Sequence, residues 1–208
     1  MKYMLALVLA LCLALPAYAE DEGVDARGDI VSSSHYDIDG DGELERVDIY
    51  LASGRRYVDD TDWCGKGDKW EGEFHVRITD NKKLLRDNPE PLHVEFFWLP
   101  AFELRFADYN SDGNVDFNVT GYSGCNLREV YLYTIYPGGR VERLDVDGDI
   151  LASTSESSTG IVNALGDGCL TTQHTDDEQG VVQETWCWNS SMFFLKDTIL
   201  VGGEEGVE

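Results

Sequence analysis

The sequence has a single long apolar run, and it lies at the very start of the chain. This run covers residues 4–15, follows Lys2 and precedes Ala-Tyr-Ala at 17–19. A basic residue, a short apolar stretch and a small-x-small end are the three parts of a secretory signal. The run is too short to cross a bilayer comfortably. We therefore expect residues 1–19 to be a cleaved signal peptide, the mature chain to have no membrane span, and its location to be periplasmic or secreted.

Basic residues are scarce. The 208 residues include 16 Lys and Arg against 40 Asp and Glu, which gives a formal net charge of −24. Affinity for nucleic acid comes largely from neutralising phosphates with basic side chains, so the charge argues against a nucleic-acid partner. An acidic surface steers basic proteins towards it. We expect a basic protein partner.

Patterns typical of a catalytic centre are missing. The histidines lack zinc spacing such as His-x-x-x-His, and Gly-Tyr-Ser-Gly at 121–124 lacks the Gly-x-Ser-x-Gly form of a nucleophile elbow, so Ser123 is interpreted as a turn residue. With 40 acidic residues, a pair of carboxylates carries no specific signal for a glycosidase. We expect the protein not to be an enzyme. The histidines are His35, His75, His93 and His174.

The tryptophans leave two interpretations open. Trp186 and Trp188 occupy alternate positions of one expected strand and so share a face. Aromatic side chains on a strand face favour packing in a core, and a surface that stacks on sugars is the other interpretation. The remaining tryptophans are Trp63, Trp70 and Trp98.

Helical periodicity is also lacking. Short alternating, β-branched or aromatic runs recur between turn signals, such as Pro-Gly-Gly at 137–139, Asp-Gly at 167–168 and Asn-Ser-Ser at 189–191. This spacing predicts an all-β fold, an antiparallel meander that is propeller-like or a sandwich. Strands are expected at residues 46–52, 73–79, 92–99, 103–107, 115–122, 129–136, 140–145, 160–165, 168–175, 181–188 and 192–196.

The length suits one domain with a sizeable core. We expect a single β domain over residues 29–201. The flanking segments 20–28 and 202–208 are acidic and contain glycine, and this composition predicts disordered tails.

Four cysteines remain after the signal: Cys64, Cys125, Cys169 and Cys187. An even number in an exported chain indicates two disulfides, which can be paired in three ways. The segment between Cys169 and Cys187 is polar and strand-like around an Asp-Asp-Glu-Gln-Gly turn. Folding it about that turn makes these two cysteines cross-strand neighbours. Cys64 and Cys125 then pair by elimination.

A repeated acidic pattern points to calcium. DIDGDGELE at 37–45 and DYNSDGNVD at 108–116 share Asp at position one, Asp or Asn at position three, Asp-Gly at five and six, and an acid at nine. Ca²⁺ takes six to eight oxygen ligands, which alternating acids supply, while glycine at position six permits the sharp bend. The other interpretation is a solvated Asp/Gly turn. The expected ligands are Asp37, Asp39, Asp41, the carbonyl of Glu43 and Glu45 in the first loop, and Asp108, Asn110, Asp112, the carbonyl of Asn114 and Asp116 in the second.

The match to an EF-hand is partial. Position twelve holds Asp48 in one loop and Val119 in the other, where an EF-hand has a bidentate Glu. The flanks are strand-like, so we expect EF-like calcium loops on a β scaffold. A third cluster keeps the alternation without the glycine and acid of positions six and nine, and is either a metal site or a turn. It consists of Asp145, Asp147 and Asp149.

The pattern D-x-D-G-D-G-x-x-[DE] before a strand resembles the calcium loops of FG-GAP and VCBS repeats, the blades of integrin-type propellers. A longer stretch, roughly 104–196, is similar to a group of bacterial periplasmic proteins; it contains FADYNSDGNVDFNV, EVYLYTIY, Pro-Gly-Gly and TWCWNSSMFFLK. The resemblance implies a propeller-like β fold, calcium loops and a periplasmic location. Some members of that group are immunity proteins that inhibit lysozyme-like effectors of rival bacteria. The chain departs from the group at Ser111, where an aromatic residue is usual.

These observations predict an exported calcium-binding module that binds a protein, with inhibition of a basic lysozyme-like enzyme as its most specific form. One alternative is a structural envelope protein in which calcium only stabilises the fold. A carbohydrate-active enzyme is the other.

Overall fold

The computed structural model describes residues 23–60, 66–153, 162–176 and 179–201. These residues contain strands and no α-helix, which confirms the predicted all-β class. The expected signal peptide (1–19) and the expected tail at 202–208 lie outside the described residues.

The strands form three sheets, which we call A, B and C in chain order. Sheet A consists of β1 (Val24–Asp25), β2 (Ile30–Tyr36), β3 (Glu45–Asp59), β4 (Gly67–Asp80), β5 (Lys83–Asn88) and β6 (Phe96–Trp98). Sheet B consists of β7 (Phe106–Ala107), β8 (Val115–Tyr122), β9 (Arg128–Tyr136), β10 (Arg140–Arg143) and β12 (Leu151–Ala152). Sheet C consists of β11 (Val146–Asp147), β13 (Asn163–Gly166), β14 (Cys169–Asp176), β15 (Gly180–Trp188) and β16 (Phe193–Leu200).

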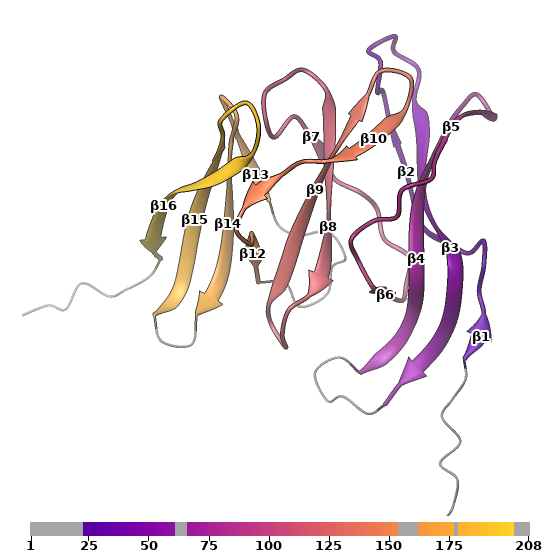
Figure 1. The fold of residues 1–208 in the computed structure, drawn as a ribbon, viewed down its shortest axis with the longest axis horizontal. Helices are drawn as coiled ribbons and strands as arrows, with labels where there is room; N and C mark the ends of the chain where they lie inside the picture. Colours follow the sequence, from indigo (N-terminus) through magenta and orange to yellow (C-terminus); the bar gives the residue numbers. More distant parts are fainter. Residues whose placement is uncertain (1–22, 61–65, 154–161, 177–178, 202–208) are drawn as a thin grey trace, which may run out of the picture.

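Neighbouring strands are antiparallel except for the short β11–β16 pair, which confirms the predicted antiparallel pairing. The sheets lie side by side, with sheet A at one end of the molecule, sheet C at the other and sheet B between them (Figure 1). Within the described residues they do not close into a propeller.

Sheet B is covered on both faces. Successive side chains of a strand point to opposite faces, so Tyr133 and Ile135 of β9 join the core shared with sheet A. Val130 and Leu132 of the same strand join a second core with Leu170, Trp186 and Phe193 of sheet C. Burying one such large side chain contributes roughly 1.5–3 kcal/mol. These two apolar layers fix the position of sheet B between its neighbours.

Some strand predictions were wrong. Only Phe96–Trp98 of the predicted strand at 92–99 and only Phe106–Ala107 of that at 103–107 lie in ladders. Leu92 and Val94 are buried, so their apolar character reflects core packing outside a ladder. The strands β2 and β5 were not predicted, because β2 contains three serines and five of the six residues of β5 are exposed.

The segment 20–28 is not a disordered tail over its described part. Val24 and Asp25 form β1, in register with Arg56 and Arg55 of β3. Ala26 is buried, and the Gly28 amide donates a hydrogen bond to the Leu51 carbonyl (2.7 Å). Main-chain pairing orders this segment despite its polar composition; residues 20–22 lie outside the described part.

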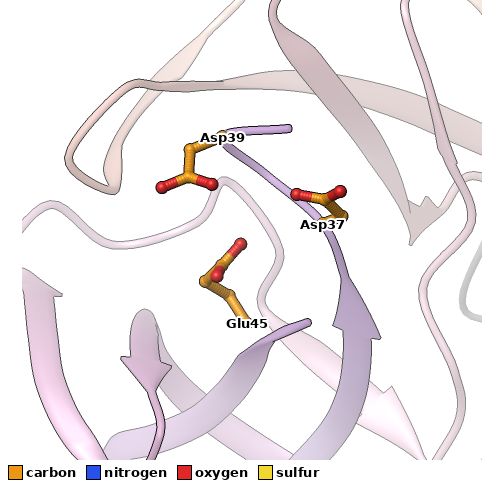
Figure 2. Close-up of side chains that lie close together, drawn as sticks. All are labelled: Asp37, Asp39 and Glu45. Atoms are coloured by element: carbon orange, nitrogen blue, oxygen red, sulfur yellow. The ribbon is translucent and has the colours of Figure 1, made fainter. Parts of the chain in front are cut away.

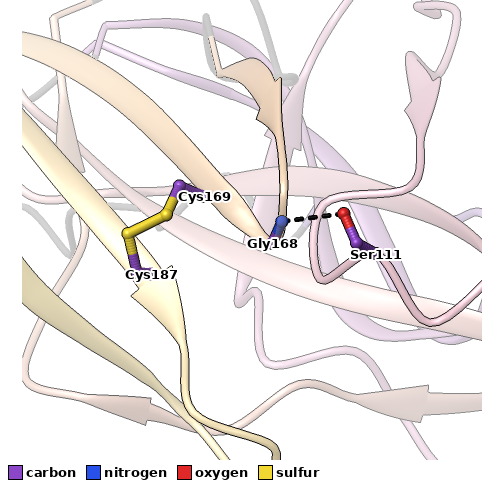
Figure 3. Close-up of a disulfide and its surroundings, with 4 residues drawn as sticks. All are labelled: Ser111, Gly168, Cys169 and Cys187. Carbon is purple, nitrogen blue, oxygen red and sulfur yellow. Dashed lines mark hydrogen bonds between the residues drawn. A yellow bond between two sulfur atoms is a disulfide. The ribbon is translucent and has the colours of Figure 1, made fainter.

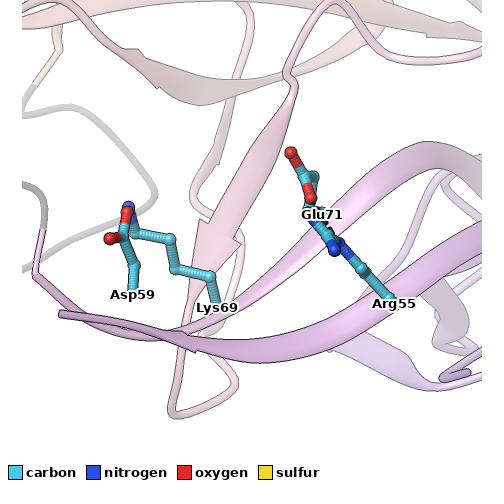
Figure 4. Close-up of polar contacts among 4 residues, drawn as sticks. All are labelled: Arg55, Asp59, Lys69 and Glu71. Atoms are coloured by element: carbon cyan, nitrogen blue, oxygen red, sulfur yellow. Dashed lines mark hydrogen bonds and ion pairs between the residues drawn. The ribbon is translucent and has the colours of Figure 1, made fainter. Parts of the chain in front are cut away.

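Two ion pairs of very different burial join β3 to β4 (Figure 4). Lys69 Nζ lies 2.8 Å from Asp59 Oδ2, and the side chains are 4% and 15% exposed. Arg55 Nε lies 2.8 Å from Glu71 Oε2, with side chains 43% and 41% exposed. The Lys69 ammonium also lies 4.4 Å from the centroid of the Phe96 ring, which adds a cation–π contact.

Replacement of Lys69 by Met is expected to lower the free energy of unfolding by about 3 kcal/mol, because it removes one charge of a largely buried ion pair. Arg55→Met is the matched control and should cost under about 1 kcal/mol, because solvent screens the exposed pair. Urea unfolding of both variants measures the difference. Equal losses would show that burial of the Lys69 pair has no energetic consequence.

Candidate metal centre

Both acidic segments connect the two strands of a hairpin. Loop 1, residues 37–45, follows β2, and loop 2, residues 108–116, follows β7. In each, the residue before position one pairs with position nine: Tyr36 with Glu45, and Ala107 with Asp116. β3 and β8 both start at the upper end of the molecule in Figure 1, so the two loops lie at the same end.

The same four hydrogen bonds form within each loop. The amide of position five donates to Oδ1 of position three, over 3.2 Å in loop 1 and 3.1 Å in loop 2. The amide of position six donates to Oδ2 of position one, over 3.0 Å in each loop. The amide of position seven donates to Oδ1 of position five, over 2.8 Å in each loop. The amide of position two donates to the carboxylate of position nine, over 2.7 Å in loop 1 and 2.8 Å in loop 2. The sequence repeat is therefore also a conformational repeat.

The backbone of both loops bends at positions four and six, where φ is positive. At position six, Gly42 has φ +89° and Gly113 has φ +87°. At position four, Gly40 has φ +78° and Ser111 has φ +57°. Glycine adopts this left-handed region freely, while other residues do so at a cost.

Loop 1 gathers three carboxylates. One oxygen each from Asp37, Asp39 and Glu45 lies within 4.8 Å of the others, and Figure 2 shows the three groups converging on one space. Glu45 is 3% exposed, so its charge is not stabilised by bulk water. Such clustering is unfavourable unless a cation neutralises it. Asp41 does not belong to this group; its Oδ1 accepts the hydrogen bond from the Glu43 amide (2.8 Å).

In loop 2 the acids do not gather in that way within the described structure. Asp108 and Asp112 are engaged by loop amides, and the buried Asn110 donates from Nδ2 to Asp112 Oδ2 (3.1 Å). The loop shares the hydrogen-bonded frame of loop 1 with one carboxylate fewer among positions one, three, five and nine.

Asp116, at position nine of loop 2, is fully buried. Its Oδ2 accepts the Tyr109 amide, but its Oδ1 has no hydrogen bond of normal geometry with the described residues. Burial raises the pKa of Asp116 to about 7, and the Thr134 hydroxyl and the Tyr109 amide oppose this rise only in part. A buried carboxylate whose hydrogen bonds compensate its burial only in part is costly, and a cation in the loop would offset that cost.

No protein-family model matches the chain, and no curated protein matches it significantly. The interpretation of the loops therefore rests on their own geometry.

The third acidic cluster lacks this geometry. Asp147 lies in β11, which pairs with β16, and the Asp145 carbonyl accepts a hydrogen bond from the Phe193 amide (2.8 Å). Asp145, Asp147 and Asp149 are exposed and, in the described part of the chain, form no group of three converging carboxylates. Of the two interpretations, the turn is favoured.

The histidines add no ligand to the carboxylate group of loop 1 in the described structure, and the buried tryptophans belong to the two cores. None of the four histidines belongs to a described group of converging metal ligands. Trp70 and Trp186 are buried in the two cores, as expected of aromatic residues on strand faces, while Trp63 lies outside the described residues. Ser123 lies in a turn, where its amide donates to the Leu127 carbonyl (3.2 Å).

The predicted Cys169–Cys187 disulfide is present. The two residues are directly opposite each other in β14 and β15, with Cα atoms 4.1 Å apart. Cys125 is also disulfide-bonded, and its expected partner, Cys64, lies outside the described residues. The described chain has no helix that is long and apolar enough to span a membrane.

One contact of loop 2 reaches another sheet. The Ser111 hydroxyl accepts a hydrogen bond from the Gly168 amide (2.7 Å), immediately before Cys169. Nothing in the spacing of residues predicts this contact, because 57 positions separate its partners. The one available signal is the serine at position four, where loop 1 has Gly40.

Proposed function

We propose that the protein binds Ca²⁺ in loops 1 and 2. The observation that carries the proposal is the shared frame: two segments with the same acidic spacing adopt the same hydrogen bonds and the same bends. In loop 1 that frame directs three carboxylates to one point. A solvated turn does not require an acid at positions one, five and nine of both loops.

The ligand chemistry favours Ca²⁺ over other metals. The side chains at these positions offer oxygen and neither thiolate nor imidazole, whereas zinc and copper prefer sulfur and nitrogen ligands. Mg²⁺ demands a near-ideal octahedron and keeps several waters. A flexible loop of carboxylates, an amide and main-chain carbonyls suits the larger, more tolerant Ca²⁺.

Calorimetric titration of the processed protein should register two calcium sites, with dissociation constants on the order of 10⁻⁴ to 10⁻³ M because position twelve lacks glutamate. At about 10 mM Ca²⁺, each site then adds about 1.4–2.7 kcal/mol to stability by mass action. We expect the melting temperature to rise by roughly 5 °C or more, and to fall again with EDTA. The same concentration of Mg²⁺ is the control. An absence of heat with millimolar Ca²⁺ would overturn the proposal.

We further propose that the protein is exported and acts as a binding module for a basic protein. A net charge of −24 supports electrostatic steering of such a partner, and the Cys169–Cys187 disulfide supports an oxidising compartment. The resemblance to propeller-like periplasmic proteins makes basic lysozyme-like enzymes the first partners to test.

The test is capture at low and high salt, with inhibition assays against basic muramidases. Retention of a basic partner at low salt supports the binding module. If no partner is retained while Ca²⁺ still raises the melting temperature, the protein is a structural envelope component. Turnover of a glycan panel would instead indicate a carbohydrate-active enzyme.

A further inference from the structure

Ser111 occupies a position that favours glycine. Its φ is +57°, and the equivalent residue of loop 1 is Gly40 with φ +78°. A left-handed conformation costs a residue with a side chain about 1–2 kcal/mol. The serine is strained where glycine would not be, and its side chain makes a contact that glycine could not make.

That contact joins loop 2 to sheet C. The Ser111 hydroxyl accepts the Gly168 amide over 2.7 Å, and Figure 3 shows it beside the disulfide. Gly168 is the second residue of the turn between β13 and β14, and its carbonyl accepts the Trp188 amide (2.8 Å). A Cβ at Gly168 would lie 3.1 Å from the Asn110 carbonyl. The turn therefore lies directly against positions three and four of loop 2.

The residue that Ser111 contacts is the direct chain neighbour of a disulfide cysteine. Cys169 follows Gly168 in the chain, and Cys187 precedes Trp188, so one hydrogen-bonded turn connects the serine to both sulfur-bearing residues. Cys169 and Cys187 are 7% and 6% exposed. A reductant has to wait for local opening of this hairpin before it reaches a buried disulfide.

Tyr109, at position two of loop 2, provides a second link. It is 2% exposed and packs in the core that contains Leu170 and Trp186 of sheet C. Its amide donates to Oδ2 of the fully buried Asp116, whose Oδ1 has no hydrogen bond of normal geometry with the described residues. Metal binding, the Tyr109 backbone and the sheet C core are thus mechanically connected.

We propose that Ca²⁺ in loop 2 fastens sheet B to the disulfide hairpin of sheet C, so that calcium protects the Cys169–Cys187 bond from reduction. The inference rests on the proposed calcium function of loop 2. An ion that fixes positions three to six holds the Ser111 hydroxyl against Gly168, and opening of the hairpin then has to break that contact. Because coupling between two equilibria is reciprocal, the intact disulfide also raises the calcium affinity of loop 2.

The test measures reduction of the native, processed chain by dithiothreitol, with and without 10 mM Ca²⁺. Two electrons pass from the dithiol, which closes to a cyclic disulfide, and Cys169 and Cys187 become thiols. Alkylation followed by peptide mass spectrometry gives the rate at this bond. Coupling of ordinary size corresponds to a change of at least about fivefold, so we expect Ca²⁺ to slow reduction by that factor.

Ser111→Gly is the decisive variant, because it keeps the bend, matches Gly40 of loop 1 and removes the side chain that carries the hydroxyl. It should bind calcium with two sites by calorimetry and lose most of the protection. Asp39→Asn, which impairs loop 1, is the control and should keep the protection. Full protection in Ser111→Gly, or unchanged reduction rates in a wild-type protein that binds two calcium ions, would overturn the inference and leave the proposed function standing. A wild-type protein without calcium heat would overturn both.

Discussion

Glutamine in place of Glu45 is expected to weaken calcium binding at loop 1 by more than about tenfold, because the affinity of such loops follows the number of charged ligands. Glu45 is nearly buried and converges with Asp37 and Asp39. The substitution keeps its size and leaves an oxygen to accept the Ile38 amide. The effect should therefore come from the lost charge, and calorimetric titration at constant ionic strength measures it.

Glu43→Gln is the control within the same loop. Glu43 is expected to offer Ca²⁺ its main-chain carbonyl, so neutralising its exposed side chain should change the dissociation constant less than about twofold, through screened surface electrostatics. If the two variants bind calcium equally well, the affinity depends on the total negative charge of the loop and not on the place of the Glu45 carboxylate beside Asp37 and Asp39.

Replacement of both Cys169 and Cys187 by alanine is expected to lower the free energy of unfolding by about 3 kcal/mol, since the bridge closes a loop of 18 residues. Alanine is preferred to serine because both sites are buried and a hydroxyl would lack a partner there. Urea unfolding in the absence of calcium gives the value.

The wild-type protein alkylated after selective reduction of this bond provides an independent comparison and should show a similar loss. A double variant as stable as the wild type would mean that the neighbouring ladders already restrain the hairpin fully. The calcium-free condition matters because bound calcium would add its own contribution to stability.

Local sequence signals were sufficient to predict a strand, a turn or a pairing where the conformation of a segment depends mainly on its own residues. β8 runs over Val115–Tyr122, as predicted, because its alternating residues are bounded by an acidic turn and a glycine-containing turn. The Cys169–Cys187 pairing followed from the turn between two polar strands. The shared frame of the acidic loops follows from spacing alone, because every hydrogen bond in it joins residues at most seven positions apart.

Other features depend on contacts between distant segments. Lys69 is buried by Asp59, Phe96 and Trp98, whereas a lysine by itself predicts an exposed surface. β1 forms only because it pairs with β3, whose partner residues Arg55 and Arg56 lie about 30 positions further along the chain. Ser111 acquires its partner only when sheets B and C meet. None of these contacts has a signature in the neighbouring sequence.

The two loops lie at one end of the molecule (Figure 1), so calcium bound as proposed would change the charge of that end alone. Residues 37–45 and 108–116 carry eight carboxylates between them. Two bound divalent ions would halve that formal charge at a single rim and leave the opposite rim unchanged. A cationic protein approaching from solution would therefore be drawn more weakly to this rim in calcium-rich surroundings and would meet the molecule in a different orientation.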